Sequence, residues 1–190
     1  MDHVLREVKR EKFYGLFNDA TDVRLEASTV CQLRCPICLT WGHESLGRGH
    51  LRFADFRRFA EQNPSFRNYE LSNNGEIFLN PELIDIIRYA HQQGLCLTAW
   101  NGVNLNTAGD EVLEALVRYR FKAILVSIDG ACQETYSIYR RGGNFQRVIE
   151  HIKKINFYKA QYGSQEPELF WKFIAFGHNE QDIPLARNMA

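Results

Sequence analysis

The sequence predicts an α/β fold: a parallel sheet covered by helices and curved into a partial (β/α) TIM-like barrel of about five βα units. Segments with the composition of strands alternate with segments whose apolar residues recur at helical spacing. Several strand segments are almost continuously apolar, as expected for parallel strands that are buried on both faces. A doubly wound open sheet has the same local pattern and stays open as an alternative.

Five segments read as strands because β-branched and other apolar residues dominate them and small or polar residues follow each one. In chain order they span residues 23–29, 69–73, 95–100, 123–128 and 170–176. Helical periodicity predicts six helical segments between and after these strands. They span residues 53–62, 81–93, 109–119, 132–139 and 145–162, and a last stretch from Asn179. Asn80-Pro81 suits the start of the second helix, and Gly94 suits its end.

Composition limits the domain organisation and the partners. The 190 residues suit one domain, which we place at residues 23–190 behind a polar lead-in of residues 1–22. The formal net charge is zero, so no electrostatic argument favours nucleic acid or an anionic membrane. The first ten residues lack the apolar core of a signal peptide, and no run approaches the roughly 20 apolar residues of a membrane span. The five cysteines are an odd number and three of them are clustered, which fits free thiols in a reducing compartment better than disulfides in a secreted protein. We therefore expect a cytoplasmic protein.

Three of these cysteines lie within eight residues, in the loop that follows the first predicted strand. Cys31, Cys35 and Cys38 have the spacing C-x3-C-x2-C. Thiolates are soft ligands that suit iron–sulfur clusters, zinc or copper(I). A structural zinc site or an electron-carrying cluster normally takes four protein ligands. Three thiolates can instead hold three irons of a [4Fe–4S] cluster and leave the fourth iron open to another molecule.

This spacing resembles that of the radical S-adenosylmethionine (SAM) superfamily. The resemblance implies that Cys31, Cys35 and Cys38 bind a [4Fe–4S] cluster whose open iron is chelated by SAM. It also implies that an electron from the cluster cleaves SAM to a 5′-deoxyadenosyl radical, which abstracts hydrogen from a substrate. An electron donor such as flavodoxin or ferredoxin is then an expected partner.

Polar residues also follow the other predicted strands. Since the carboxyl ends of parallel strands meet at one edge of the sheet, we expect these residues to converge on a single site. They are Gly75, Glu76, Asn101, Ser127, Asp129, His178 and Asn179.

The segment Ser72-Asn-Asn-Gly75-Glu76 resembles the superfamily's Gly-Gly-Glu motif, with Asn74 at the first glycine position. The resemblance implies that Gly75 lets the backbone approach the methionine end of SAM and that the Glu76 carboxylate receives its ammonium group. The alternative is an ordinary Asn-Gly turn with a solvated glutamate.

The fourth predicted strand, with Ser127 and Asp129, resembles the family segment that contacts the ribose and the methionine moiety. Arg140 resembles an arginine that pairs with the carboxylate of SAM, a task that suits the guanidinium fork. Asn101 resembles a third-strand asparagine near the cofactor. A turn at Asp129, a surface charge at Arg140 and an Asn-Gly turn at Asn101 are the structural alternatives. Ile37 departs from the family, which often has an aromatic residue there.

Residues 128–145 look most like the branch that often carries a C-terminal SPASM or twitch extension, whose members modify peptides, activate partner enzymes or alter small molecules. We find no such extension within the 190 residues, and five predicted βα units where the family usually has six. We therefore expect a C-terminally incomplete core domain whose substrate is a peptide, a partner protein or a small molecule. No residue is predicted as a hydrogen donor or an acid–base group.

Two other function classes stay open. In a zinc-stabilised binding module, His43 or His50 would be the fourth ligand and the protein would be colourless. An inactive barrel remnant would serve only as an interaction domain and would not bind SAM.

Overall fold

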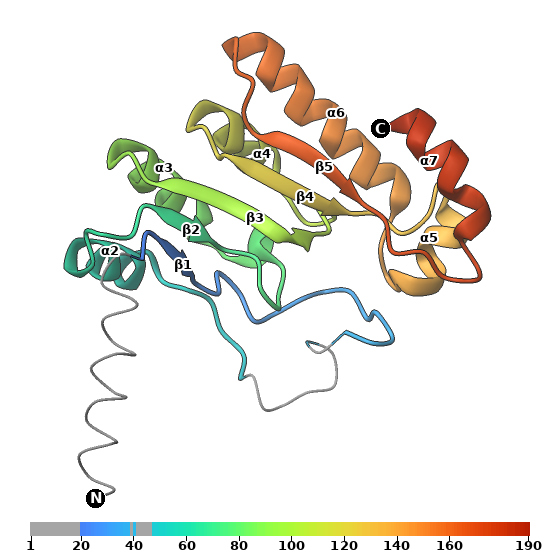
Figure 1. Cartoon of the computed structure of the whole chain (residues 1–190), viewed down its shortest axis with the longest axis horizontal. Helices are drawn as coiled ribbons and strands as arrows, with labels where there is room; N and C mark the ends of the chain where they lie inside the picture. The colour runs from blue at the N-terminus through green and yellow to red at the C-terminus, as the bar shows by residue number, and fades with distance from the viewer. Residues whose placement is uncertain (1–19, 39, 41–46) are drawn as a thin grey trace, which may run out of the picture.

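The computed structural model describes residues 20–38, 40 and 47–190 (Figure 1). Most of the predicted lead-in therefore lies outside the described residues, as does His43, one of the two candidate zinc ligands.

All five predicted strands are present and form one parallel sheet in the order β1-β2-β3-β4-β5. The strands are β1 (Asp22–Arg24), β2 (Asn68–Glu70), β3 (Cys96–Val103), β4 (Ala123–Ser127) and β5 (Glu168–Lys172). In the described chain, β1 and β5 form the two edges, so the sheet is not closed. This arrangement confirms the predicted α/β class and is that of a partial barrel.

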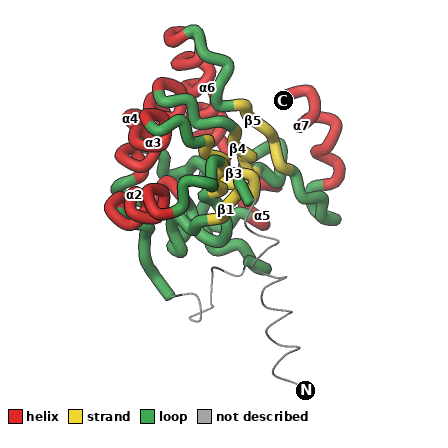
Figure 2. Tube along the Cα trace, turned by 60° about the vertical axis from the view of Figure 1, so that its left-hand side comes forward, coloured by secondary structure: helices red, strands yellow, loops and turns green. Residues whose placement is uncertain are grey.

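Helices cover one face of the sheet. Figure 2 shows α2, α3, α4 and α6 grouped on the same side of the strands. The helices are α2 (Phe53–Gln62), α3 (Leu83–Gln92), α4 (Asp110–Arg118), α5 (Gln133–Tyr139), α6 (Phe145–Tyr162) and α7 (Ile183–Met189), with 3₁₀ turns η2 (Ile77–Leu79) and η3 (Glu180–Asp182). In the part of the chain that the structure describes, no helix combines the length and apolar character needed to cross a membrane.

The core lies between these helices and the sheet, because apolar residues at helical spacing meet every second strand residue. Ile86 and Leu116 of the helices and Leu97 and Ile124 of the strands are all buried in it. Helices α2 and α6 begin and end at the predicted residues. For α6 the reason is local: the Asn144 side chain accepts the N–H of Arg147 at its start, and a left-handed glycine ends it.

The predicted strand ends were wrong in a way that matters for the site. Strand β3 does not end at residue 100 but continues to Val103, across an irregularity in its pairing with β4. There the backbone N–H groups of Trp100 and Asn101 donate hydrogen bonds to the Glu70 carboxylate (N···O 2.8 and 3.5 Å). Gly102 (φ +113°) supplies the left-handed conformation that the irregularity needs.

The other strands are displaced or shorter than predicted. Strand β1 covers Asp22–Arg24 instead of 23–29, β2 ends at Glu70 instead of 73, and β5 ends at Lys172 instead of 176. Strand β5 stops in register with its partner, because Lys172 pairs with Ser127, the last residue of β4. The apolar residues beyond Lys172 pass into the loop that leads to α7.

The face of the sheet without these helices carries the alternate strand residues. Over β1, β2 and β3 it has a hollow of about 510 Å³, whose lining includes Arg24, Glu70 and Trp100. Trp100 and Phe170 lie against each other on this face, with ring centroids 4.9 Å apart. This face therefore carries polar residues such as Arg24 and Glu70 over β1 and β2, and the aromatic pair of Trp100 and Phe170 toward β5.

Candidate functional site

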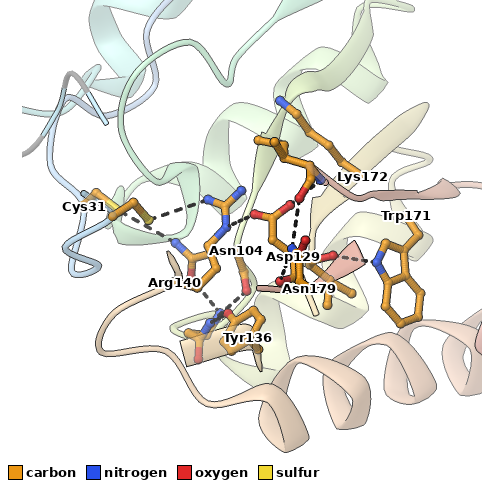
Figure 3. A network of polar contacts seen from close by, with 12 residues as sticks. Cys31, Asn104, Asp129, Tyr136, Arg140, Trp171, Lys172 and Asn179 are labelled. Carbon is orange, nitrogen blue, oxygen red and sulfur yellow. Dashed lines mark hydrogen bonds and ion pairs between the residues drawn. The ribbon is translucent and has the colours of Figure 1, made fainter. Parts of the chain in front are cut away.

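The cysteine loop lies at the carboxyl end of the sheet, where two networks of polar contacts reach it. One runs from Cys31 to the end of β3, and the other runs from Cys35 to the ends of β4 and β5 (Figure 3). Both are built largely from buried side chains.

Cys31 belongs to a closed ring of three side chains. Its thiol donates to Gln32 Oε1 (3.8 Å), Gln32 Nε2 donates to Asn104 Oδ1 (2.7 Å), and Asn104 Nδ2 donates back to Cys31 Sγ (3.8 Å). Asn104 follows β3 directly and is 4% exposed. The end of the third strand therefore contacts the cysteine loop through a residue that the sequence analysis did not select.

The Glu76 carboxylate holds the segment that carries Asn104 through backbone hydrogen bonds. Its Oε2 accepts the backbone N–H of Asn104 (2.7 Å), and its Oε1 accepts that of Phe78 (3.4 Å). The side chain is 1% exposed, and this burial raises the pKa of Glu76 to about 7. The predicted alternative of a solvated glutamate is wrong, because the carboxylate is buried and the backbone N–H of Glu76 donates to the carbonyl of Val30, the residue before Cys31.

A second buried asparagine extends this network to α5. Asn106 donates its backbone N–H to Asn104 Oδ1 (3.0 Å), and its Nδ2 donates to the Tyr136 hydroxyl (2.9 Å). Its Oδ1 accepts the N–H of Asn144 (2.7 Å) at the start of α6. The segment that carries Asn104 is thereby fixed to two helices.

The second network centres on Arg140, which ends α5. Its Nε donates to Asp129 Oδ2 (2.6 Å), and its Nη1 lies 3.8 Å from Cys35 Sγ. Burial opposes the guanidinium charge, but the charges of Asp129 and Cys35 and the hydrogen bond to Asp129 raise the pKa of Arg140. The predicted alternative of a surface charge is wrong for Arg140, whose side chain is 14% exposed.

Asp129 connects this arginine to the segment after β5. Its Oδ1 accepts the N–H of Ile174 (2.7 Å), and its backbone carbonyl accepts Asn179 Nδ2 (3.0 Å). Asp129 and Asn179 are both completely buried. One carboxylate thus holds together the ends of β4 and β5 and the arginine beside Cys35.

Gly75 brings the turn after β2 against the segment between β1 and the cysteine loop. A Cβ on Gly75 would lie 1.9 Å from the carbonyl oxygen of Ser28, so only glycine fits this approach. The Glu26 carboxylate accepts the backbone N–H of Asn74 (2.9 Å) and secures the turn. Glu26 is another residue of this region that sequence reasoning missed.

Asn101 in β3 and Ser127 in β4 lie on neighbouring strands. A Cβ on Gly102 would lie 2.3 Å from Ser127 Oγ, so β3 and β4 pack closely there. The Asn101 carbonyl accepts Lys172 Nζ (2.9 Å), and its Nδ2 donates to Asn73 (3.3 Å). Within the described residues, no hydrogen bond links Asn101 or Ser127 to the three cysteines. Their predicted contacts with SAM stay predictions.

The three thiols suit an iron–sulfur cluster by donor type, and two of them already have N–H donors beside them. Burial raises the pKa of Cys31 to about 12 and also raises the pKa of Cys35, against the opposing charge of Arg140. Metal loading must therefore displace protons. Across the described ranges, no three Cys, His, Asp or Glu side chains lie close enough together to hold a metal ion in this structure.

A signal for the missed residues existed. The rule that chemistry follows the carboxyl ends of parallel strands selects Asn104 and Asn106 once β3 is taken to end at Val103. The hydrogen bond between the buried Tyr136 hydroxyl and Asn106 joins residues 30 positions apart and has no local sequence signature.

Comparison with known proteins places the chain in a family. The family model of the Radical SAM superfamily matches residues 25–159. A "tungsten-containing aldehyde ferredoxin oxidoreductase cofactor-modifying protein" of Pyrococcus furiosus is 26% identical over 168 residues, which are 86% of this chain and 46% of that protein. An "AdoMet-dependent heme synthase" of Methanosarcina barkeri is 30% identical over 138 residues, which are 70% of this chain and 39% of that protein. The chain thus spans less than half the length of either relative.

Solved structures show the same fold at low identity. SuiB of Streptococcus suis, bound to its precursor peptide SuiA, superposes with a TM-score of 0.75 at 13% identity, covering 99% of this chain and 40% of SuiB. Methylornithine synthase (PylB) superposes with a TM-score of 0.61 at 13% identity, covering 89% of this chain and 49% of that chain. The family match, which covers more than half of the chain, confirms the resemblance read from the cysteine spacing. The chain belongs to the radical SAM superfamily, whose enzymes use a [4Fe–4S] cluster and SAM.

Proposed function

We propose that residues 23–190 form the core domain of a radical SAM enzyme, with Cys31, Cys35 and Cys38 as the three protein ligands of a [4Fe–4S] cluster. The observation that carries this proposal is the pair of buried polar networks that end on Cys31 and Cys35 at the carboxyl edge of a parallel sheet. A zinc module lacks comparable support. Of its two candidate fourth ligands, His50 is exposed and His43 lies outside the described residues.

When bound, such a cluster supplies the electron that cleaves SAM and so starts radical chemistry on the substrate. The chain's own residues bind, orient and shield the reacting groups. Glu76 and Asn106 fix the segment that carries Asn104 beside Cys31, and Asp129 fixes Arg140 beside Cys35. The cysteine loop is thus positioned from two sides by groups that do not themselves bind metal.

The SAM site is proposed at the same edge. Arg140 has five N–H donors, of which Asp129 and Cys35 take two, so its guanidinium keeps donors for the carboxylate of SAM. The turn at Gly75 brings backbone close to the segment before the cysteine loop, and Glu76 beside it would receive the ammonium group of SAM. Asn101, Ser127 and Asp129 complete the proposed contacts with the ribose and the methionine moiety.

The substrate and partners are proposed more broadly. The hollow that includes Arg24, Glu70 and Trp100 is on the helix-free face of the sheet, and we propose this face as the substrate side. The SuiB structure contains a precursor peptide, which supports a peptide among the substrate classes of a peptide, a partner protein or a small molecule. A flavodoxin or ferredoxin would supply electrons, and the free thiols suit the cytoplasm.

Cluster assembly in cysteine variants tests the proposal. After anaerobic reconstitution, the wild-type chain is expected to hold about four irons and four sulfides, the content of the cluster itself. The C31S/C35S/C38S variant should hold none. C96S/C132S is the matched control, because these two free cysteines lie outside the loop, and it should load like the wild type. One zinc per wild-type chain with no iron–sulfur absorption would overturn the proposal.

A further inference from the structure

We propose that Asn104 sets the reduction potential of the cluster by donating a hydrogen bond to Cys31, an inference that rests on the proposed function. Asn104 Nδ2 lies 3.8 Å from Cys31 Sγ, and the residue is 4% exposed. Asn104 acts through Cys31 and is therefore a positioning residue rather than a catalytic one.

The orientation of the Asn104 amide is fixed by its neighbours. Its other terminal atom lies 3.0 Å from the backbone N–H of Asn106, which can only donate. That atom must therefore be the oxygen, and it also accepts Gln32 Nε2 (2.7 Å). The NH₂ group is left to face Cys31.

The position of Asn104 is fixed as firmly as its orientation. Its backbone N–H is held by Glu76 Oε2 (2.7 Å), and its backbone carbonyl accepts Asn106 Nδ2 (3.0 Å). Asn106 is in turn bonded to the buried Tyr136 hydroxyl (2.9 Å). The donor at Cys31 is thus preorganised by buried groups and needs no ordering when the sulfur gains charge.

The direction of the effect follows from charge. The reduced cluster carries one more negative charge than the oxidised cluster and shares it with its thiolate sulfurs. A fixed N–H donor stabilises the reduced form more than the oxidised form and so raises the potential. Arg140 donates to Cys35 in the same way, but it is also proposed to bind SAM. Asn104 therefore gives the cleaner test.

The test uses two substitutions at Asn104 and one elsewhere. N104D keeps the oxygen that Gln32 and Asn106 need but removes the donor to Cys31, and N104L removes the donor without adding charge. N80D is the matched control, because Asn80 is equally buried and its Nδ2 donates to the backbone carbonyls of Ala27 (2.9 Å) and Leu51 (2.8 Å) instead of a cysteine.

The full chain and its variants are reconstituted anaerobically, and the potential is measured by redox titration with electron paramagnetic resonance (EPR) detection of the reduced cluster. Both Asn104 variants are expected to titrate at a more negative potential than the wild type, with N104D shifted further, while N80D titrates with the wild type. Wild-type potentials in loaded Asn104 variants, or an equal shift in N80D, would overturn the inference.

Two further outcomes separate this inference from the proposed function. Loss of the cluster from both Asn104 variants, with the wild type and N80D loaded, would assign Asn104 to cluster retention and overturn its tuning role. A wild-type chain that assembles no cluster would overturn the proposed function and this inference with it.

Discussion

Arg140 Nε donates to Asp129 Oδ2 at 2.6 Å, in an ion pair whose side chains are 14% and 0% exposed. The pair is bonded on both sides, because Arg140 also donates to Cys35 and Asp129 also accepts the N–H of Ile174. A buried pair contributes little net stability as a pair, but the loss of one partner leaves the other charge buried and unpaired. The Asp129–Arg140 pair therefore connects the ends of β4 and β5 to the cysteine loop, and substituting either residue should destabilise the fold.

We expect D129N to lower the free energy of unfolding by about 3–5 kcal/mol, the usual cost of breaking a buried ion pair. Asparagine keeps an oxygen for Ile174 but leaves Arg140 without its anion. Urea unfolding of the metal-free chain measures the change.

The control for that prediction is an exposed ion pair on α3. Asp85 and Arg88 are 49% and 44% exposed, and D85N is expected to cost less than about 1 kcal/mol. Equal losses in the two variants would show that the burial of the Asp129–Arg140 pair has no energetic consequence.

A methyl group at Gly75 tests the close approach of the turn after β2. A Cβ there would lie 1.9 Å from the carbonyl oxygen of Ser28, which is backbone and cannot turn away. We expect G75A to cost about 3 kcal/mol of unfolding free energy, at the upper end of overpacking effects. We also expect weaker SAM binding in the reconstituted protein, measured by equilibrium dialysis.

G109A is the matched substitution, since a Cβ on Gly109 meets nothing within 4 Å. It should unfold within about 1 kcal/mol of the wild type, because alanine is a somewhat poorer N-cap than glycine. If G75A is as stable as G109A, the turn does not lie against Ser28 in solution.

Glu76 makes stability depend on pH. Burial raises its pKa from 4.5 to about 7 in the folded chain, so the folded state holds a proton that the unfolded state releases. The contribution of this group is present below pH 4.5 and is lost as the pH rises to about 7. Through this group, the wild type should lose about 2 kcal/mol of unfolding free energy between pH 5 and pH 7. E76Q cannot titrate at this position, so we expect its loss over the same range to be smaller by that amount.

Urea unfolding at several pH values between 5 and 7 measures this effect. E61Q changes an exposed carboxylate on α2 and should keep the wild-type pH dependence. A pH dependence in E76Q as steep as that of the wild type would mean that the Glu76 carboxylate is not buried uncharged.

Sequence alone predicted the elements whose signals are local. The helix over residues 145–162 has both apolar periodicity and terminal signals, so its bounds agree with the structure. The end of β3 was missed because Asn101-Gly102 has the composition of a turn. What keeps the strand extended is Glu70, a carboxylate on the neighbouring strand that bonds the N–H groups of Trp100 and Asn101. A contact of this kind has no signature near residue 101.

The site shows the same division. The cysteine spacing and the Gly75-Glu76 pair were visible because they are contiguous in sequence. Asn104 was not selected, because its role depends on where β3 ends and on Glu76, which lies 28 residues earlier. The partners of Arg140 could not be predicted either, since Asp129 and Cys35 approach it only in the folded chain.

The central claim is that three cysteines hold a cluster with one iron open to SAM. The most direct test is EPR spectroscopy of the reconstituted and reduced chain, recorded with and without SAM. We expect a [4Fe–4S]⁺ signal that changes when SAM is added, because SAM would bind the open iron. A cluster signal that is indifferent to SAM, or a zinc protein with no such signal, would contradict the claim.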